Sequence, residues 1–141
     1  MTAYHLLRND LIRDEGLKLK PYKDSVGKLS IGIGRNLDDR GITEVEAYAM
    51  CDHDIDIVAT ELDRNASWWR DLPEPAQRGL MNMCFNMGWP RLSRFNRMLS
   101  ALKLQSFKIA AAEALDSTWA KQVGARAERI AGDFRGCEVS E

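Results

Sequence analysis

The stretch "RDEGLKLKPYKDSVGKLSIGIGRN", residues 13–36, decides how the N-terminal part of this chain folds. Just before it, Leu7 and Leu11 are four positions apart and, with Leu6 and Ile12, form an apolar stripe that predicts an amphipathic helix over residues 4–15. Gly16 follows at the position where helices commonly end. The segments 19–24 and 28–34 have the composition of short strands on either side of the turn "SVG". We therefore expect a helix followed by a β-hairpin.

The rest of the chain has the patterns of helices. Residues 38–41 contain two Asp and a Gly and are expected to form a loop. Thr43, with Glu46 three residues later, is a capping-box signature that predicts a long helix to residue 66. The segment after "PEP", residues 76–88, is apolar on nearly all sides and predicts a buried helix. Further helices are expected at three places, residues 92–104, 106–116 and 123–133.

These elements predict a mostly helical α+β fold. A hydrophobic content of 45% and a charged content of 29% are those of a globular protein. We expect a single domain over residues 1–141, with a small hairpin-bearing lobe at approximately 1–60 and a helical lobe at approximately 61–141. The long helix, on the order of 30 Å at 1.5 Å per residue, would join them. A cleft between the lobes is the expected place for a substrate.

Charge and cysteine content limit the classes of partner. The formal net charge of −1 gives no global attraction to nucleic acid. Residues 1–75 carry a net −5 and residues 76–141 a net +4, which suits an anionic polymer or a solvated helix surface. No segment has the length of apolar sequence that a membrane span or a secretion signal requires. The three cysteines, Cys51, Cys84 and Cys137, show no metal or disulfide spacing, and Cys84 is expected in the core.

Two carboxylates in the opening stretch can be interpreted as an acid and a base. Glu15 ends the apolar stripe of the first helix, where burial and the helix dipole would favour its protonated form. Asp24 stands at the start of a turn, where a hydrogen-bonded carboxylate stays ionised. Each residue also has a structural interpretation, as an acid paired with an Arg or as an Asx-turn.

The strand that follows has one hydroxyl beside two glycines. If the segment is a regular strand, Ser30, Gly32 and Gly34 share one face, and two of these three positions have no side chain. Glycine in a strand often marks close approach of a ligand or of another chain segment. A phosphate-binding loop is excluded, because Leu37 occupies the place of the third glycine and no helix is predicted directly after the motif.

The spacing of these residues resembles the phage-type lysozymes of glycoside hydrolase family 24, of which the T-even phage lysozymes are best known. The resembling pattern is a Glu, an Asp nine positions later, and a hydroxyl six positions after that, followed at once by "IGIG". The resemblance continues in "NMCFNMG" at 82–88, in Phe95, in Trp119 and in "RAERIAGDFRG" at 126–136. It implies a lysozyme-like fold.

The resemblance also implies roles for individual residues. Glu15 would be the general acid, Asp24 the carboxylate that activates or orients water, and Ser30 the hydroxyl that helps to hold that water. Substrate-binding positions are implied in both halves of the chain: Gly32, Gly34, Arg35, Phe85, Asn86, Gln122 and Arg126. Among these, Arg126 matches the arginine that pairs with the catalytic Glu, which would oppose the effect of burial on the Glu15 pKa.

Three departures from the family pattern concern the hairpin. Ser30 replaces the usual Thr and lacks its methyl group and part of its χ1 stiffness. Arg35 replaces the usual His, so this position keeps its charge near neutral pH. The segment "NLDDRGIT" is much shorter than in the T-even relatives, which predicts a smaller N-terminal lobe.

The function implied is that of a muramidase, which hydrolyses the β-1,4 bond between N-acetylmuramic acid and N-acetylglucosamine in peptidoglycan. Two carboxylates suffice for this reaction without metal or cofactor. The resemblance implies inversion, which needs the carboxyls ~6.5–9.5 Å apart, against ~5 Å for a retaining enzyme. Two other functions stay open: a lytic transglycosylase, and a non-catalytic wall-binding or virion structural module.

The expected setting is phage infection of a bacterium. The partner would be the glycan strands of peptidoglycan, with no nucleic acid and no insertion into a membrane. We expect a monomer, either a free endolysin or part of a larger virion protein. Such a chain would be made in the host cytoplasm and reach the periplasm through a holin pore or with the virion.

Overall fold

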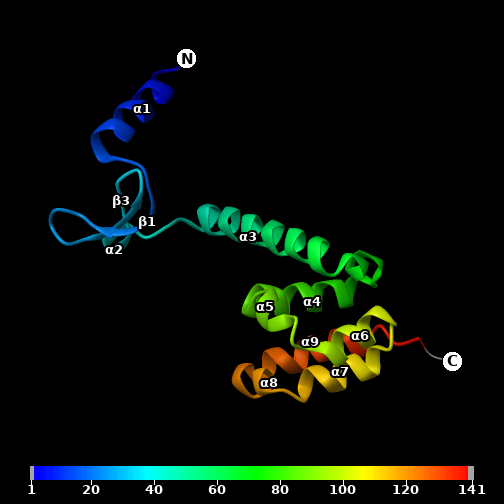
Figure 1. Ribbon diagram of the computed structural model, residues 1–141. Helices are drawn as coiled ribbons and strands as arrows, with labels where there is room; N and C mark the ends of the chain where they lie inside the picture. Colours follow the sequence, from blue (N-terminus) through cyan, green and yellow to red (C-terminus); the bar gives the residue numbers. More distant parts are fainter. Residues whose placement is uncertain (1, 140–141) are drawn as a thin grey trace. The chain divides into compact units, whose positions relative to one another are not determined.

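The computed structural model describes residues 2–139 (Figure 1). These residues form two compact units, and the division between them falls between Ala49 and Met50. The first unit contains the helix α1, a three-stranded sheet, the short helix α2 and the first turns of α3. The second unit contains the rest of α3 and the remaining helices. The predicted mostly helical α+β fold is confirmed, including its early strands and its long helix.

The helix α1, Ala3–Glu15, confirms the predicted first helix and its end. Thr2 precedes it as the N-cap residue, and its side chain accepts a hydrogen bond from the backbone N–H of His5 at 3.4 Å. Gly16 follows with a φ of +83°, and its N–H donates to the carbonyl of Ile12. This left-handed conformation favours glycine, so Gly16 both ends the helix and turns the chain toward the sheet.

The sheet is antiparallel and has the order β1-β2-β3, with strands Lys18–Lys23, Leu29–Gly32 and Arg35–Asn36. The third strand and the tight turn before it were not predicted, since a run of only two strand residues has no periodicity to detect. The register of β1 against β2 is irregular between Lys18 and Tyr22. Pro21 lies in this interval, and a residue without an N–H is tolerated on an edge strand or at a bulge.

Residues 37–40 form the short helix α2, Leu37–Arg40, so the expected loop at residues 38–41 is wrong. The side chain of Asn36 accepts the N–H of Asp39 at 3.0 Å and thereby caps this helix. The long helix α3, Glu44–Asn65, is confirmed with its capping box. The N–H of Thr43 donates to Glu46 Oε1 at 2.9 Å, and the N–H of Glu46 donates to Thr43 Oγ1 at 3.2 Å.

The second unit is entirely helical in the part of the chain that the structure describes. After the 3₁₀ helix η1, Ser67–Asp71, the predicted buried helix is confirmed as α4, Glu74–Met87. The expected helix at 92–104 is shorter, because a turn separates α5, Trp89–Leu92, from α6, Asn96–Lys103. The last two predicted helices correspond to α7, Phe107–Leu115, and α9, Ala125–Arg135, with the unpredicted α8, Thr118–Val123, between them.

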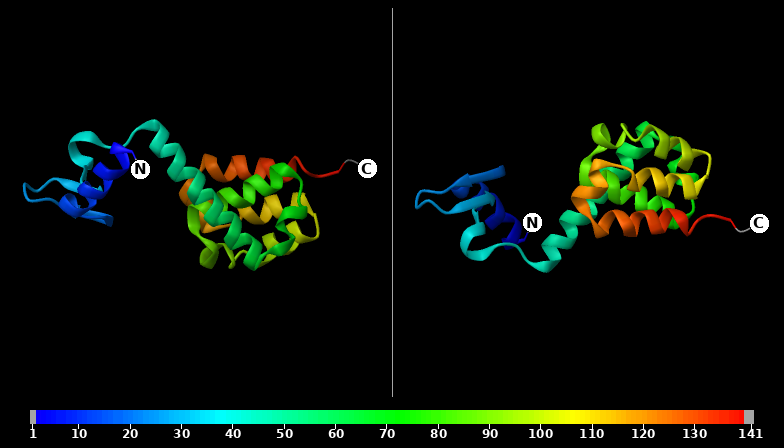
Figure 2. Two further views of the ribbon diagram at one scale, coloured as in Figure 1. Left: turned by 90° about the horizontal axis from the view of Figure 1, so that it is seen from above. Right: turned by 90° about the horizontal axis from the view of Figure 1, so that it is seen from below.

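The apolar core lies in this second unit. The buried apolar side chains among the described residues all fall between Val58 and Phe134, and α9 lies beside both α4 and α7 (Figure 2). Cys84 is 2% exposed and belongs to this core, as predicted. Its burial, with a smaller contribution from the charge of Glu61, raises the pKa of its thiol to about 11, so the thiol stays protonated and unreactive at neutral pH.

Candidate active site

Glu15 is the last residue of α1, and its side chain lies against Gly34 in the turn between β2 and β3. A Cβ atom added to Gly34 would stand 3.0 Å from Glu15 Oε2 and 3.1 Å from Glu15 Cβ. The carboxyl group therefore occupies the space that a side chain at position 34 would fill. Glu15 is exposed in the structure, so the burial expected for it from the helix pattern is wrong.

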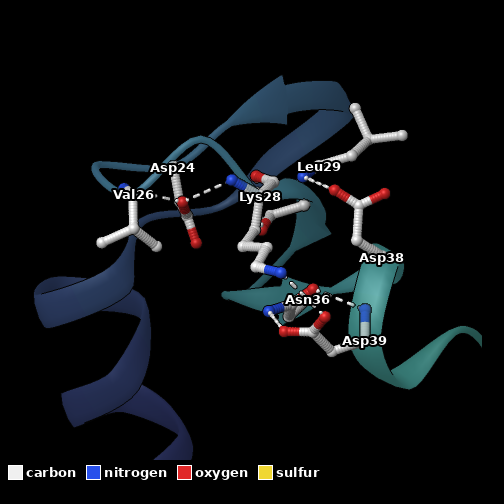
Figure 3. A network of polar contacts seen from close by, with 8 residues as sticks. Asp24, Val26, Lys28, Leu29, Asn36, Asp38 and Asp39 are labelled. Atoms are coloured by element: carbon white, nitrogen blue, oxygen red, sulfur yellow. Dashed lines mark hydrogen bonds and ion pairs between the residues drawn. The ribbon is translucent and has the colours of Figure 1, made fainter.

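Asp24 follows β1 and closes the turn that joins this strand to β2. Its Oδ1 accepts two backbone N–H groups, from Val26 at 2.9 Å and from Lys28 at 2.8 Å (Figure 3). Both hydrogen bonds go to the same oxygen, and among the described residues none donates to Oδ2. The Asx-turn interpretation of Asp24 is thus confirmed, and it coexists with a carboxylate that keeps one oxygen free for another partner.

Two acids of α2 support this turn from the other side, and the sequence reasoning assigned them no role. Asp38 Oδ2 accepts the N–H of Leu29 at 2.7 Å. Asp39 pairs with the ammonium of Lys28 at 3.0 Å and also receives the side-chain amide of Asn36 (Figure 3). These contacts depend on how α2 folds back on the hairpin, and the local signals for so short a helix are the capping Asn36 and the Gly41 that ends it.

Ser30 lies in the central strand, where it is paired with Tyr22 on one side and Asn36 on the other. It is 2% exposed and is the one buried polar residue among residues 2–139. Its hydroxyl donates to the carbonyl of Lys28 in a long contact of 3.4 Å. The hydroxyl is therefore linked to the same turn that Asp24 organises.

Gly32 is the last residue of β2, whereas Gly34 lies in the turn and does not share the strand face of Ser30 as expected. Both have left-handed backbones, with φ of +71° at Gly32 and +69° at Gly34. A Cβ on Gly32 would meet open space, whereas one on Gly34 would meet Glu15. Gly34 therefore makes room for the carboxyl of Glu15, and open space remains at Gly32.

Arg35 is committed to contacts inside the first unit. Its guanidinium donates to both carboxylate oxygens of Glu46, at 2.9 and 2.7 Å, and to the carbonyl of Gly41 at 3.1 Å. These bonds, with the contacts from Thr43, lower the pKa of Glu46 to about 2, and the hydrogen bond to Glu46 raises the pKa of Arg35. The ion pair ties β3 to the first turn of α3.

The second unit holds a cavity of about 870 Å³ that is lined by Asn86 and Gln122. The indole N–H of the buried Trp119 donates to Asn86 Oδ1 at 2.8 Å. Phe95 packs edge-on against the same indole, with ring centroids 6.2 Å apart. The contact with Trp119 holds the side chain of Asn86 on the wall of the cavity.

A second cavity in this unit, of about 520 Å³, is lined by Phe85 and Arg126. Phe85 is 45% exposed, which is unusual for a large apolar side chain in a helix so well packed elsewhere. Arg126 donates from Nε and Nη2 to Asn82 Oδ1, at 2.9 and 2.7 Å. Asn82 was not predicted as a site residue, although it begins the motif at 82–88.

The predicted site residues thus fall into two groups. The first unit contains Glu15, Asp24, Ser30, Gly32, Gly34 and Arg35. The second unit contains Phe85, Asn86, Gln122 and Arg126.

Within residues 2–139 no group of three or more His, Cys, Asp or Glu side chains is placed to hold a metal ion. No helix in that range has both the length and the apolar character for crossing a membrane.

Comparison with known proteins identifies relatives over nearly the whole chain. The phage lysozyme family profile matches residues 12–132. Probable T4-type lysozyme 2 of Dictyostelium discoideum is 26% identical to this chain over an alignment of 164 positions. The alignment covers 96% of each chain. The pre-baseplate central spike protein of Enterobacteria phage T4 is 28% identical to this chain over an alignment of 158 positions. The alignment covers 92% of this chain but only 27% of the spike protein. A SAR-endolysin of Bacteriophage PS34 is 33% identical over 78 residues, covering 52% of this chain and 46% of that protein.

Proposed function

Because this chain belongs to the phage lysozyme family, a family of peptidoglycan hydrolases, we propose that it is a muramidase with an inverting mechanism. The bond cleaved is the β-1,4 linkage between N-acetylmuramic acid and N-acetylglucosamine. The observation that carries the proposal is the pair of carboxyl groups in the first unit. The side chain of Glu15 lies against Gly34. The carboxylate of Asp24 accepts backbone N–H groups through its Oδ1 atom.

Asp24 is suited to the role of the base. Two backbone N–H donors hold Oδ1 and fix the orientation of the carboxylate. Oδ2 can then accept a proton from a water molecule without disturbing the turn. Because the anchoring bonds come from the backbone, the turn itself orients this carboxylate.

Glu15 is assigned the role of the acid. In its protonated form it donates to the leaving glycosidic oxygen while water attacks the anomeric carbon and loses a proton to Asp24. The C–O bond to the leaving sugar breaks as the bond to water forms, so the product has the opposite anomeric configuration. Proton exchange with solvent then returns both carboxyl groups to their starting states. Ser30 Oγ would help to hold the water on the Asp24 side.

The first test replaces the acid. We expect Glu15→Gln to lower the release of reducing ends from purified peptidoglycan sacculi by about 10²–10⁴-fold, the usual effect of removing a general acid. Asp14→Asn is the matched control, because it removes the neighbouring exposed carboxylate of the same helix and should keep the activity. The first-formed reducing end should have the α configuration by proton NMR.

Three outcomes would contradict the proposal. A Glu15→Gln variant as active as the unaltered chain excludes Glu15 as the acid. Products that consist mainly of 1,6-anhydro sugars indicate a lytic transglycosylase, in which a sugar hydroxyl replaces water. An unaltered chain that binds sacculi but releases no reducing ends is a wall-binding or structural module.

The proposed role is opening of the bacterial wall during phage infection, with the glycan strands of peptidoglycan as partner and a monomeric chain as the working unit. Synthesis in the host cytoplasm and action in the periplasm follow from this role. The relatives of this chain include both an endolysin and a pre-baseplate spike protein. Mass spectrometry of purified virions separates the two routes: this sequence in washed virions supports delivery by the virion, and its presence only in host lysates supports a free endolysin.

A further inference from the structure

A single peptide group connects the two residues that the proposed mechanism places around the attacking water. The carbonyl of Lys28 accepts the backbone N–H of Asp24 at 2.9 Å and the hydroxyl of Ser30 at 3.4 Å. The same peptide group ends in the N–H of Leu29, which donates to Asp38 Oδ2 at 2.7 Å. Because a peptide group is planar and trans, its C=O and N–H point in opposite directions, so these contacts hold it from both sides.

The preceding peptide group binds the carboxylate of Asp24 itself. The N–H of Lys28 donates to Asp24 Oδ1 at 2.8 Å, and the same oxygen accepts the N–H of Val26 (Figure 3). The N–H groups of Lys28 and Leu29 are thus successive along the chain and donate to two different acids, Asp24 and Asp38. A displacement of the chain at Leu29 would therefore move one of the two donors that orient the Asp24 carboxylate.

The position of Asp38 is set by the way in which α2 joins the sheet. Asn36 is the last residue of β3, and its side chain caps α2, so the helix begins directly at the edge of the sheet. The helix lies beside both β2 and β3. At its other end, the carbonyl of Gly41 accepts the guanidinium of Arg35 at 3.1 Å. Asp38 is therefore held on a segment that is fixed at both ends.

Asp39, the next acid of α2, makes contacts of a different kind. It pairs with the ammonium of Lys28 at 3.0 Å, and both side chains are partly exposed. It also accepts the side-chain amide of Asn36 at 3.0 Å. Ion pairs between exposed side chains contribute little to stability. Of the two neighbouring acids, Asp38 thus binds the backbone of the hairpin, whereas Asp39 binds side chains.

We propose that Asp38 is a positioning residue for hydrolysis. Through one peptide group of the turn, it holds Asp24 and Ser30 in the places from which they orient the attacking water. A hydrogen bond from a backbone N–H to a carboxylate is charge-assisted and stronger than one between neutral groups. It also polarises the peptide group, which makes the carbonyl of Lys28 a better acceptor. The inference rests on the proposed function for the roles of Asp24 and Ser30.

The first measurement is kinetic and uses soluble, un-cross-linked peptidoglycan strands as substrate. We expect Asp38→Ala to lower kcat about tenfold and to leave KM within about twofold, because the orientation of Asp24 matters in the transition state. Asp38→Asn should restore most of kcat, since its amide oxygen can accept the same N–H. Asp39→Ala is the matched control, because it removes the same charge from the same short helix, and it should keep kcat.

A double variant tests whether Asp38 acts through Asp24. In the Asp24→Asn background, Asp38→Ala should lower the residual kcat by less than about twofold, because the carboxylate that it orients is gone. A general loss of structure would instead lower kcat about tenfold in both backgrounds. That result would overturn the inference.

The second measurement does not depend on catalysis. The N–H groups of Val26 and Lys28, which donate to Asp24, are followed by amide hydrogen exchange in the full chain. Asp38→Ala should speed their exchange about tenfold, and Asp39→Ala should change it by less than about twofold. Asp38→Glu keeps the charge and displaces the carboxylate by one methylene, so it replaces Asp38→Ala if that variant does not fold.

The two measurements together separate the inference from the proposed function. An unaltered kcat in Asp38→Ala overturns the inference, and so does an equal loss of kcat in Asp39→Ala. If the unaltered chain hydrolyses the strands and neither measurement responds to Asp38→Ala, the inference alone is rejected. If the unaltered chain hydrolyses nothing while the exchange of Val26 and Lys28 responds to Asp38→Ala, the proposed function fails and the anchoring of the turn stands.

Discussion

At the scale of single residues, Gly34 is constrained in two ways. Its φ of +69° lies in the left-handed region, where a side chain is strained, and the space for a Cβ is taken by Glu15. Most glycines at turns satisfy only the first constraint. Gly34 therefore connects the geometry of a turn to the position of a proposed catalytic side chain.

Gly34→Ala is expected to displace Glu15 and to lower the hydrolysis of sacculi by about 10²-fold, the order expected for a misplacement near 1 Å. The left-handed backbone adds a loss of about 1–2 kcal/mol in unfolding free energy. Gly41→Ala is the control, since its φ is +63° and a Cβ there meets open space. It should lose similar stability and keep its activity, measured by reducing-end release and thermal unfolding. Equal activity of the two variants would show that the Gly34 contact does not position Glu15.

At the scale of the elements, the first unit depends on polar contacts between short segments. The pair of Arg35 and Glu46 joins β3 to α3, and the pair of Lys28 and Asp39 joins the hairpin to α2. Glu46 also completes the capping box of α3 through Thr43. The Glu46 carboxylate thus binds both the start of α3 and the guanidinium of Arg35 on β3, and this gives Arg35 a structural role in the first unit.

This dual role predicts a dependence on pH. Because the folded-state pKa of Glu46 is lowered to about 2, the unfolded chain binds more protons than the folded chain between about pH 4.5 and about pH 2. The stabilisation by Glu46 is therefore complete above about pH 4.5 and is lost as the pH falls toward 2. Glu46→Gln should be less stable at neutral pH and should lose less stability on acidification, as measured by thermal unfolding across this window.

Glu44→Gln is the matched control for this measurement, because Glu44 lies in the same first turn of α3 but accepts only the hydroxyl of Tyr48. Its stability should follow the pH dependence of the unaltered chain. If the curves of the unaltered chain and of Glu46→Gln run parallel through the acid range, the pairing with Arg35 does not stabilise the fold.

At the scale of the whole molecule, the apolar core of the described residues belongs to the second unit, where α4 packs against α9. Gly79 stands where these helices approach, and a Cβ on it would be 2.8 Å from Phe134 Cε1. Phe134 is fully buried, so its ring has little room to move. The absence of a side chain at Gly79 sets how closely the two helices pack.

Gly79→Ala is expected to lower the unfolding free energy by about 1–3 kcal/mol, the usual cost of overpacking, despite the better helix propensity of Ala. Gly132→Ala, also within a helix of the same unit, meets no atom within 4 Å and should raise it by up to about 1 kcal/mol. Chemical denaturation of both variants measures the two effects. A stabilised Gly79→Ala variant would mean that Phe134 moves aside freely.

The sequence alone was sufficient for the elements that have a strong local pattern. The first helix with its glycine end, the capping box of α3, the buried α4 and the Asx-turn at Asp24 each depend on residues within a few positions of one another. Shorter segments were missed or misread, such as α2, β3 and the break before α6. In these segments the backbone is stabilised by contacts with distant residues, as when Asp38 binds the N–H of Leu29.

The chemical identity of the carboxyl groups and their spacing along the chain were determined by the sequence, since these are properties of order and composition. Only the tertiary structure decided what each group touches. Folding places Glu15 against Gly34, pairs Arg35 with Glu46, and brings Asn86 and Gln122 to the wall of one cavity. The physical reason is that a contact depends on distance in space, and residues as far apart in the sequence as Asn82 and Arg126 are brought within reach only when the helices pack.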